Sequence, residues 1–123
     1  VRARVHAAAV AGDDPVYRLT ALIPATKKAL VRAGLSINDI GAFEISEAFA
    51  PVPLAWQVET GADMTKVNQR GGAIALGHPV GASGGRLMTT LLSTMEDTGA
   101  RYGLQAMCEG GGVSNATILE LAD

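Results

Sequence analysis

Residues 83–121, SGGRLMTTLLSTMEDTGARYGLQAMCEGGGVSNATILEL, predict a helix that is followed by two strands. The first part of this stretch carries one apolar stripe at helical spacing, formed by Leu87, Met88, Leu91, Leu92 and Met95. Such a stripe is typical of an amphipathic helix that packs against a sheet. We therefore predict a helix over residues 83–98, ended by Gly99 at the position where helices often stop.

The second part of the stretch predicts a β-hairpin. The segments 102–107 and 113–121 have the length and apolar content of strands, and the short link 109–112 between them contains three glycines. A short glycine-containing link between two such segments is a hairpin signal. We expect the two strands to pair with each other.

The sequence before residue 83 alternates strands and helices. We predict strands over residues 1–10 and 40–45 and helices over residues 24–33 and 51–60, each helix followed by a glycine that stops it. Residues 61–82 form a long connection, and connections of this length in compact domains tend to be functional. The predicted order, β-α-β-α-loop-α-β-β, indicates an α/β layered domain with a mixed β-sheet and helices packed on it.

Length and composition exclude several classes of protein. The chain has 123 residues, which is one domain by size, and 48% of them are hydrophobic, which is sufficient for a core. With a net charge of −2, we expect no nucleic acid as a partner, and no segment is apolar for long enough to span a membrane. A single cysteine rules out an internal disulfide, which fits the cytoplasm. Since Val1 already lies in a predicted strand, we expect the domain of residues 1–123 to be part of a longer protein.

Two glycine-rich loops carry the residues with candidate chemistry. Residues 71–85 place six glycines around His78, and Cys108 precedes three glycines. Glycine lets main-chain N–H groups approach a ligand, and cysteine and histidine together can carry out acyl or proton transfer. The N–H of Gly110 and its neighbours could stabilise an oxyanion. Structural roles stay open, with Cys108 as a small buried hydrophobic residue and His78 as a hydrogen-bonding loop residue.

Three other chemistries fit the sequence poorly. The G-x-S-x-G pattern at residues 81–85 has neither a preceding strand nor a later histidine, so we assign no hydrolase nucleophile there and expect Ser83 to cap the next helix. The glycine spacing of residues 72–77 is followed by His78 and Pro79 instead of the lysine and hydroxyl residue of a phosphate loop. Two histidines and one cysteine show no metal-ligand spacing, so we expect no metal.

Three segments resemble motifs of the thiolases, the acetyl-CoA acetyltransferases and 3-ketoacyl-CoA thiolases. Residues 71–84, GGAIALGHPVGASG, resemble the histidine loop of that family, and residues 108–112, CEGGG, resemble its terminal cysteine–glycine loop. Residues 44–50, EISEAFA, resemble its Asn-Glu-Ala-Phe segment. The similarity covers nearly the whole chain and only the C-terminal half of such an enzyme. It implies a thiolase-like fold, an acyl-CoA substrate with no further cofactor, an N-terminal thiolase half as partner, and a homo-oligomer.

The resemblance also implies roles for individual residues. His78 would activate the nucleophilic cysteine and later bind a thioester or enolate oxygen, and Cys108 would move the α-proton of the acyl-CoA. The Gly110 N–H would belong to an oxyanion hole. Because the nucleophilic cysteine of the family lies in the N-terminal half, we expect the isolated chain to be inactive. The implied reaction is 3-ketoacyl-CoA thiolysis, or the reverse Claisen condensation, in fatty acid and lipid metabolism.

Ser46 departs from the family motif, which has asparagine at this position. In the family, that asparagine positions a water in the oxyanion hole for the enolate. A serine hydroxyl is shorter but still donates and accepts hydrogen bonds, so Ser46 is a candidate substrate-positioning residue. Loss of one oxyanion contact costs about 10²–10³ in rate. Ser46 therefore leaves an alternative open, a thiolase-like protein that binds acyl-CoA or lipid with weak or no catalysis.

We expect the other distinctive residues to be structural. Glu47 is predicted either to orient a loop by accepting backbone N–H bonds or to be solvated, and Asn68 is predicted to lie in a turn. Phe49 and Trp56 are predicted to lie in the core. His6 is predicted to be a surface or edge residue with no identifiable partner.

Overall fold

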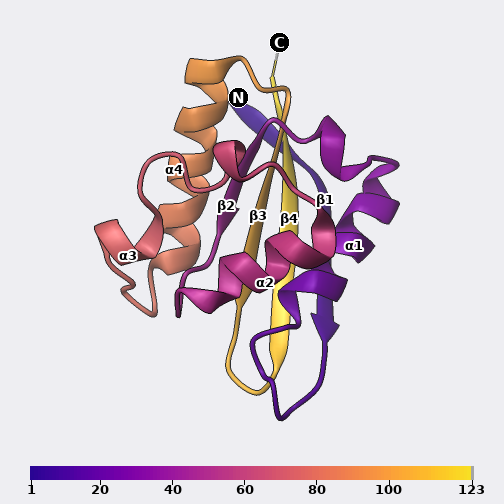
Figure 1. Cartoon of the computed structure of the whole chain (residues 1–123). Helices are drawn as coiled ribbons and strands as arrows, with labels where there is room; N and C mark the ends of the chain where they lie inside the picture. The colour runs from indigo at the N-terminus through magenta and orange to yellow at the C-terminus, as the bar shows by residue number, and fades with distance from the viewer. Residues whose placement is uncertain (123) are drawn as a thin grey trace.

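The centre of the fold is one four-stranded sheet, shown in Figure 1 for the computed structural model, which describes residues 1–122. The strands are β1 (Ala3–Gly12), β2 (Ala42–Ile45), β3 (Tyr102–Cys108) and β4 (Val113–Leu121). They lie in the order β1-β4-β3-β2. β4 pairs antiparallel with β1 and β3, whereas β2 pairs parallel with β3. The predicted mixed sheet and its closing hairpin are therefore confirmed.

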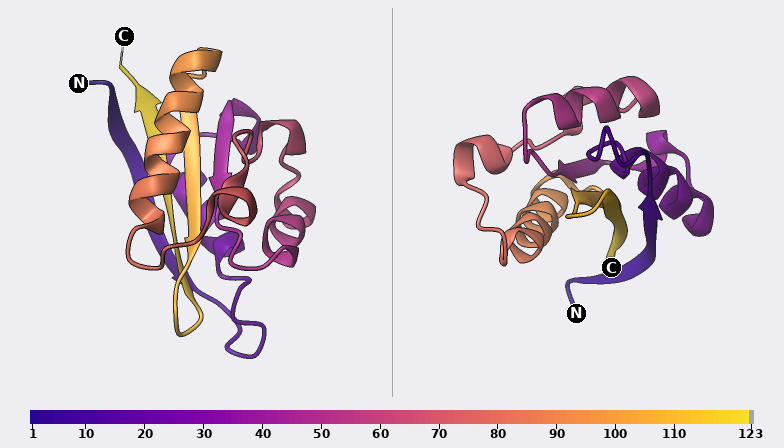
Figure 2. Two further views of the ribbon diagram at one scale, coloured as in Figure 1. Left: turned by 90° about the vertical axis from the view of Figure 1, so that its left-hand side faces the viewer. Right: turned by 90° about the horizontal axis from the view of Figure 1, so that it is seen from below.

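Helices cover both faces of this sheet. They are α1 (Leu22–Ala33), α2 (Pro51–Thr60), α3 (Gly72–Leu76) and α4 (Ser83–Thr98). α4 packs on one face, against β2 and β3, while α1 and α2 lie on the other (Figure 2). The predicted element order is confirmed, but the connection before α4 is not a plain loop, because it contains α3 and a short 3₁₀ turn. Within residues 1–122, no helix is both long and apolar enough to cross a membrane.

Helix boundaries follow the prolines and glycines closely. α2 and α4 have the predicted bounds, and α1 ends as predicted before Gly34. α1 begins at Leu22 rather than at the predicted Pro24. The first-turn N–H groups of a helix have no acceptor within the helix, so a proline is tolerated anywhere in that turn and does not mark its first residue.

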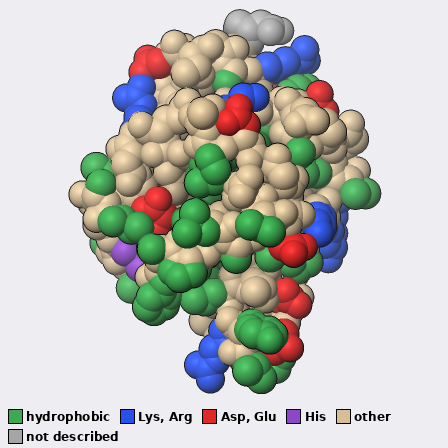
Figure 3. Space-filling view, in the orientation of Figure 1, with side chains coloured by type: hydrophobic (Ala, Val, Ile, Leu, Met, Phe, Trp, Pro, Cys, Tyr) green, Lys and Arg blue, Asp and Glu red, His purple; other side chains and the backbone are tan. Residues whose placement is uncertain are grey.

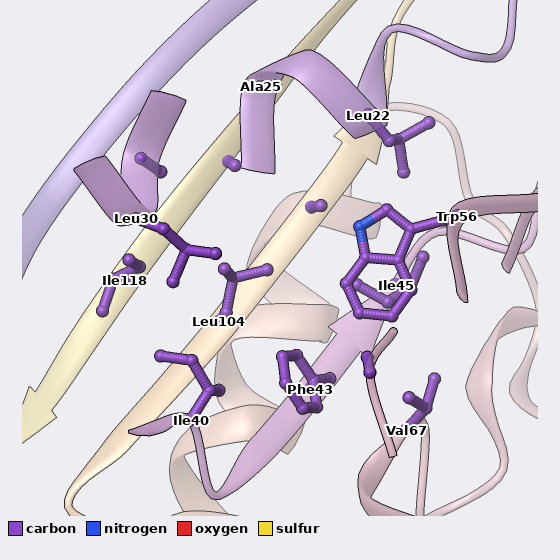
Figure 4. Packing of buried hydrophobic residues seen from close by; sticks show 14 of the residues in the cluster. Leu22, Ala25, Leu30, Ile40, Phe43, Ile45, Trp56, Val67, Leu104 and Ile118 are labelled. Atoms are coloured by element: carbon purple, nitrogen blue, oxygen red, sulfur yellow. The ribbon is translucent and has the colours of Figure 1, made fainter. Parts of the chain in front are cut away.

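The main core lies between the sheet and helices α1 and α2. Its centre is Trp56 of α2, which is 1% exposed and contacts Phe43 edge-on at a ring-centroid distance of 5.4 Å. Figure 4 shows Leu22, Phe43 and Ile45 around the indole ring. The indole N–H donates a 2.9 Å hydrogen bond to Thr26 Oγ1 and so links α2 to α1. The prediction for Trp56 holds.

Phe49, in contrast, is not a core residue. Its side chain is 64% exposed, so the prediction that placed it in the core is wrong. Phe49 lies in the turn between β2 and α2, outside the helix and the sheet that enclose the core. Trp56 differs because it lies inside α2, seven residues later, on the side of the helix that is buried in the core.

A smaller core lies on the opposite face, under α4. It consists of Leu91 and Met95 of α4 packed against Ala42 and Leu119 of the sheet. α4 comes very close to β3 at Gly103, where an added Cβ atom would lie 2.4 Å from Met95 Sδ. The predicted apolar stripe of α4 is therefore buried against the sheet, and glycine at position 103 permits the short approach.

A buried carboxylate links three neighbouring strands at the end of the sheet that lies near both termini. Glu120 of β4 accepts hydrogen bonds from Arg101 at 2.7 Å and from Arg4 at 2.7 Å. These contacts lower the pKa of Glu120 to about 2. His6 Nδ1 lies 3.2 Å from the same carboxylate, and its Nε2 lies 3.3 Å from the Ala33 carbonyl oxygen. The prediction that His6 has no partner is therefore wrong, since its partners come from distant parts of the chain.

Substitution of Gly103 tests the close approach of α4. Gly103→Ala should destabilise the protein by about 1–3 kcal/mol, because the new methyl group overpacks the contact with Met95. Gly85, an exposed position within α4 whose added Cβ would meet nothing within 4 Å, provides the control. Gly85→Ala should stabilise the protein by about 0.5–1 kcal/mol. Urea unfolding of both variants measures the difference, and equal effects would contradict the packing described.

Candidate active site

Both glycine-rich loops border one pocket. The pocket has a volume of about 430 Å³, and its lining includes His78 from the loop before α4 and Cys108 and Gly110 from the β3–β4 hairpin. Leu19 and Ala48 supply apolar lining. His78 is exposed and Cys108 is half-buried, so an imidazole and a thiol face the same accessible space. Residues 30 positions apart in the chain are thus presented together to any small molecule that enters.

Parallel strand pairing places Ser46 beside the thiol. β2 and β3 run in the same direction, so their carboxyl ends lie at one edge of the sheet. The Ser46 N–H donates a 2.9 Å hydrogen bond to the Ala106 carbonyl oxygen and extends the pairing by one residue. Ser46 is buried, and its Oγ lies 3.7 Å from Cys108 Sγ, within reach of a weak hydrogen bond.

A fixed hydrogen-bond chain orients the His78 ring. His78 Nδ1 lies 2.6 Å from Ser83 Oγ, and that hydroxyl donates to the Pro79 carbonyl oxygen at 2.9 Å. A serine hydroxyl has one proton, and the carbonyl oxygen can only accept it. Ser83 therefore accepts from His78, so the neutral ring carries its proton on Nδ1 and leaves Nε2 with a free lone pair. That is the form of imidazole that acts as a base through Nε2.

Ser83 does not cap α4, contrary to the sequence prediction. It is the first residue inside the helix, the flanking Ala82 is the N-cap, and the Ser83 hydroxyl bonds backward to Pro79. A serine near the start of a helix usually caps that helix, and the local sequence does not distinguish capping from a hydrogen bond backward to the Pro79 carbonyl oxygen. The proximity of His78, five residues earlier, was the available signal that sequence reasoning missed.

Glu47 and Asn68 hold the connection before α4 against β2. The Asn68 amide accepts from the Ile45 N–H at 2.8 Å and donates to the Ile45 carbonyl oxygen at 3.0 Å. The same amide donates to Glu47 Oε1 at 2.8 Å, and Glu47 Oε2 accepts from the Ile74 N–H at 2.8 Å. Glu47 therefore orients a loop through a backbone N–H, one of the two predicted possibilities. Asn68 lies in a turn, as predicted, since its carbonyl oxygen accepts a 2.9 Å hydrogen bond from the Gly71 N–H. Its side-chain contacts to Ile45 and Glu47 were not predicted.

A group of buried polar side chains lies beneath the site, on the α4 face of the sheet. Glu44 of β2 is 1% exposed, and its register partner is Gln105 of β3. Glu44 Oε2, Gln105 Oε1 and all three guanidinium nitrogens of Arg86 are buried without a hydrogen-bond partner among residues 1–122. Burial raises the pKa of Glu44 to about 7, although the nearby Arg86 acts in the opposite direction. The sequence provides no indication of this cluster beyond the presence of Glu44 inside a predicted strand.

The described residues include no cluster of side chains arranged as metal ligands. Residues 1–122 contain no group of three or more histidine, cysteine, aspartate or glutamate side chains placed to hold one. Glu109, next to Cys108, is exposed and accepts a hydrogen bond from Asn115 across the hairpin. The groups available for chemistry at the pocket are therefore an imidazole, a thiol, the Glu109 carboxylate and main-chain N–H groups, and the Ser46 hydroxyl lies beside the thiol.

Comparison with known proteins identifies one family. Residues 1–121 match the family described as Thiolase, C-terminal domain. The chain is 58% identical over 119 residues to the steroid 3-ketoacyl-CoA thiolase FadA6 of Mycobacterium tuberculosis, covering 97% of this chain and 29% of that protein. It is 50% identical over 123 residues to the 3-ketoacyl-CoA thiolase of Aliivibrio salmonicida, covering 98% and 32%. The crystal structure of human mitochondrial 3-ketoacyl-CoA thiolase superposes with a TM-score of 0.94 at 40% identity, covering 98% of this chain and 30% of that one.

The fold and pocket define an α/β domain that presents two residues to one pocket, a cysteine at the carboxyl end of β3 and a histidine in the glycine-rich loop before α4. The chain belongs to the thiolase family and corresponds to its C-terminal domain. It spans about a third of the length of the relatives it matches.

The protonation of His78 can be measured directly. In the full-length protein, ¹⁵N-histidine NMR should show the proton of the neutral His78 ring on Nδ1, because Ser83 can only accept from it. Ser83→Ala removes the acceptor and should shift the ring toward the Nε2–H form. Ser83→Thr keeps a hydroxyl and serves as the matched control, and a His78→Gln spectrum identifies the signal. A wild-type ring protonated on Nε2 would contradict the assignment.

The buried Glu44 predicts a particular dependence of stability on pH. Its folded pKa of about 7 lies above its ordinary value of 4.5, so the fold favours the protonated form. The stability that this form supplies is complete below pH 4.5 and is lost as pH rises toward 7. Glu44→Gln stays neutral and should remove this loss, which we expect to be roughly 2 kcal/mol after allowing for solvent screening. Urea unfolding of both proteins between pH 4.5 and 8 measures it, and parallel pH profiles would contradict the burial of the charge.

Proposed function

We propose that the protein containing this chain is a 3-ketoacyl-CoA thiolase, which cleaves a 3-ketoacyl-CoA with free CoA or runs the reverse condensation. The observation that carries the proposal is that His78, Cys108 and Gly110 border one pocket in a domain of the thiolase family. The relatives named above support the thiolytic direction, since their names specify 3-ketoacyl-CoA.

Cys108 is proposed to move the α-proton. In condensation, its thiolate removes a proton from the α-carbon of an acyl-CoA. The resulting enolate carbon attacks the thioester carbonyl of an acyl group held on a second cysteine, and that cysteine leaves as a thiolate. In thiolysis the thiolate of the second cysteine attacks the 3-keto carbonyl, the carbon–carbon bond breaks, and the Cys108 thiol gives its proton to the departing carbon. Free CoA then takes the acyl group from the second cysteine, which leaves as a thiolate, and the CoA thiol proton passes to the Cys108 thiolate. The half-buried position of Cys108 in the pocket wall suits a group that must reach a substrate carbon.

His78 is proposed to take the proton of the second cysteine and later to donate to a thioester or enolate oxygen. Both roles need Nε2, and the bond between Nδ1 and Ser83 leaves Nε2 available. A base held in one tautomer and one orientation acts without first having to reorganise. Ser83 is therefore a positioning residue for His78.

Oxyanion stabilisation is proposed to come from the Gly110 N–H and from the surroundings of Ser46. Gly110 lines the pocket next to the thiol loop, where a main-chain N–H can face a developing negative charge. The Ser46 hydroxyl, 3.7 Å from Cys108 Sγ, can donate to the thiolate or to a water near it. This contact compensates in part for the asparagine that the family has at position 46.

The complete enzyme is proposed to contain more than this chain. We infer that residues 1–123 are one domain of a longer polypeptide whose other part carries the nucleophilic cysteine, since the only cysteine here is Cys108. Acyl-CoA and CoA are the substrates, and no metal or other cofactor takes part. We further propose a homo-oligomer located in the cytoplasm.

Replacement of His78 or Cys108 tests the proposal. In the full-length protein, His78→Ala and Cys108→Ser should each slow the thiolysis of a ketoacyl-CoA substrate at saturation by about 10²–10⁴-fold, the usual contribution of general acid–base groups. The two variants should differ in a partial reaction, because Cys108→Ser blocks exchange of the α-protons of acetyl-CoA with deuterated water but leaves acylation of the nucleophile possible.

The other histidine of the chain provides the control. His6 lies at the Glu120 edge of the sheet and is absent from the pocket lining, so His6→Ala should keep thiolysis near the wild-type rate per folded molecule. A His78→Ala enzyme that retains wild-type thiolysis would refute the role of the imidazole. A Cys108→Ser enzyme that still exchanges α-protons would refute the role of the thiol.

A further inference from the structure

The buried polar side chains on the α4 face connect the three segments that supply the site. We call them the Glu44 cluster, and its members are Glu44, Gln105 and Arg86. In the same order, they lie two residues before Ser46, three residues before Cys108 and three residues after Ser83. The cluster is therefore placed where β2, β3 and the start of α4 meet beneath the pocket.

The first turn of α4 rests on the carboxyl end of β3. Gln105 Nε2 donates a 3.4 Å hydrogen bond to the carbonyl oxygen of Gly84, the second residue of α4. An added Cβ atom at Gly84 would lie 3.4 Å from Sδ of Met107, the penultimate residue of β3. Because Ser83 belongs to the same turn and holds the His78 ring, a movement of α4 relative to β3 would move the imidazole as well.

The charges of the Glu44 cluster are buried, in contrast to charges at the surface. Figure 3 shows acidic and basic side chains scattered over one face of the molecule, where water and salt screen them. Glu44 is 1% exposed, and the guanidinium nitrogens of Arg86 are buried without a hydrogen-bond partner among residues 1–122. Opposite charges attract more strongly in such surroundings than at the surface. The attraction acts between β2 and the start of α4.

Two further charged groups act on Glu44. After burial itself, Arg86 has the largest effect on the pKa of Glu44, and it lowers that pKa. Glu47 raises the same pKa, and Arg70, from the connection before α3, lowers it. Arg70 is already paired with Asp97 of α4. Arg86 is therefore the main opposite charge for the Glu44 carboxylate.

We propose that Glu44 and Arg86 are positioning residues for His78. The attraction between their charges holds the first turn of α4 beside the carboxyl end of β3, so that the imidazole and the thiol of Cys108 keep their places around one pocket. The apolar packing further along α4 is not directional and does not by itself fix the position of this turn. The inference rests on the proposed function, because it takes His78 to be the base that activates the second cysteine.

Removal of the Glu44 charge should separate activity from stability. At pH 8, Glu44→Gln in the full-length enzyme should be at least as stable as the wild type, because no buried carboxylate has to ionise. Its kcat for thiolysis of acetoacetyl-CoA or 3-ketooctanoyl-CoA, whichever the wild type cleaves faster, should nevertheless fall about tenfold, with KM within about twofold, because a displaced base slows the chemical step. Glu96→Gln, which breaks the exposed pair with Arg2 on the last turns of α4, is the matched control and should keep kcat within about twofold.

Substitution of Arg86 tests whether the two charges act as a pair. Arg86→Met leaves Glu44 without its opposite charge and favours the protonated carboxyl group, so it should reproduce the loss of kcat. The double variant should then be no slower than either single variant. Losses that multiply, or a loss with Arg86→Met but none with Glu44→Gln, would overturn the inference, because Arg86 would then act on a different partner. Should Arg86→Met fail to fold, Glu44→Gln and its control decide alone.

A second measurement separates the inference from the proposed function. The rate at which iodoacetamide alkylates the nucleophilic cysteine of the full-length enzyme reports its activation by His78. Slow alkylation in His78→Ala but a wild-type rate in Glu44→Gln would overturn the inference while the role of the imidazole stands. An unchanged rate in His78→Ala would contradict the proposed function. The ¹⁵N-histidine spectrum then decides the inference: Glu44→Gln should shift the His78 signals, and signals identical to those of the wild type would overturn it.

Discussion

The parallel pairing of β2 with β3 is the constraint on which the site depends. It brings the ends of two strands from distant parts of the chain to one edge of the sheet, where Ser46 and Cys108 meet. β2 has only four residues and lies at the edge of the sheet, so pairing on one side alone would hold it weakly. The Asn68 amide supplies the missing side, because it bonds both the N–H and the carbonyl of Ile45 as a neighbouring strand would.

Local patterns were sufficient to predict most of the architecture. The apolar stripe of α4, the glycines that follow α1 and α2, and the glycine link of the hairpin are short-range signals, and each is present in the structure. The loops of His78 and Cys108 were also recognisable, because glycine runs beside reactive residues are uncommon. Errors arose where the deciding partner lies far away in sequence. His6 was predicted to have no partner but contacts Glu120, and the contacts of the Asn68 side chain with Ile45 were not foreseen, because neither pairing leaves a periodic pattern in the chain.

The two faces of the sheet have different physical characters. The face under α1 and α2 is packed with apolar side chains around Trp56, and the buried polar link between Trp56 and Thr26 leaves the indole N–H satisfied. The α4 face near the site instead buries Glu44 and the guanidinium of Arg86 without complete hydrogen bonding. Groups of this kind cost stability, and they lie next to the start of α4, where Gln105 Nε2 donates to the Gly84 carbonyl oxygen at 3.4 Å. The part of the sheet nearest the His78 loop is therefore not optimised for stability alone.

Part of the glycine content that suggested a ligand loop is explained by the protein's own carboxylate. Gly72 has a φ of 63°, and an added Cβ atom there would lie 2.5 Å from the carboxyl group of Glu47. Since Glu47 must reach the Ile74 N–H to hold α3, position 72 has no room for a side chain. The glycines nearest to His78 do not make such contacts, because an added Cβ at Gly77 or Gly81 meets nothing within 4 Å. The glycines of this stretch therefore differ in role: Gly72 lets the loop dock on Glu47, whereas Gly77 and Gly81 leave the space beside the backbone near His78 free of side chains.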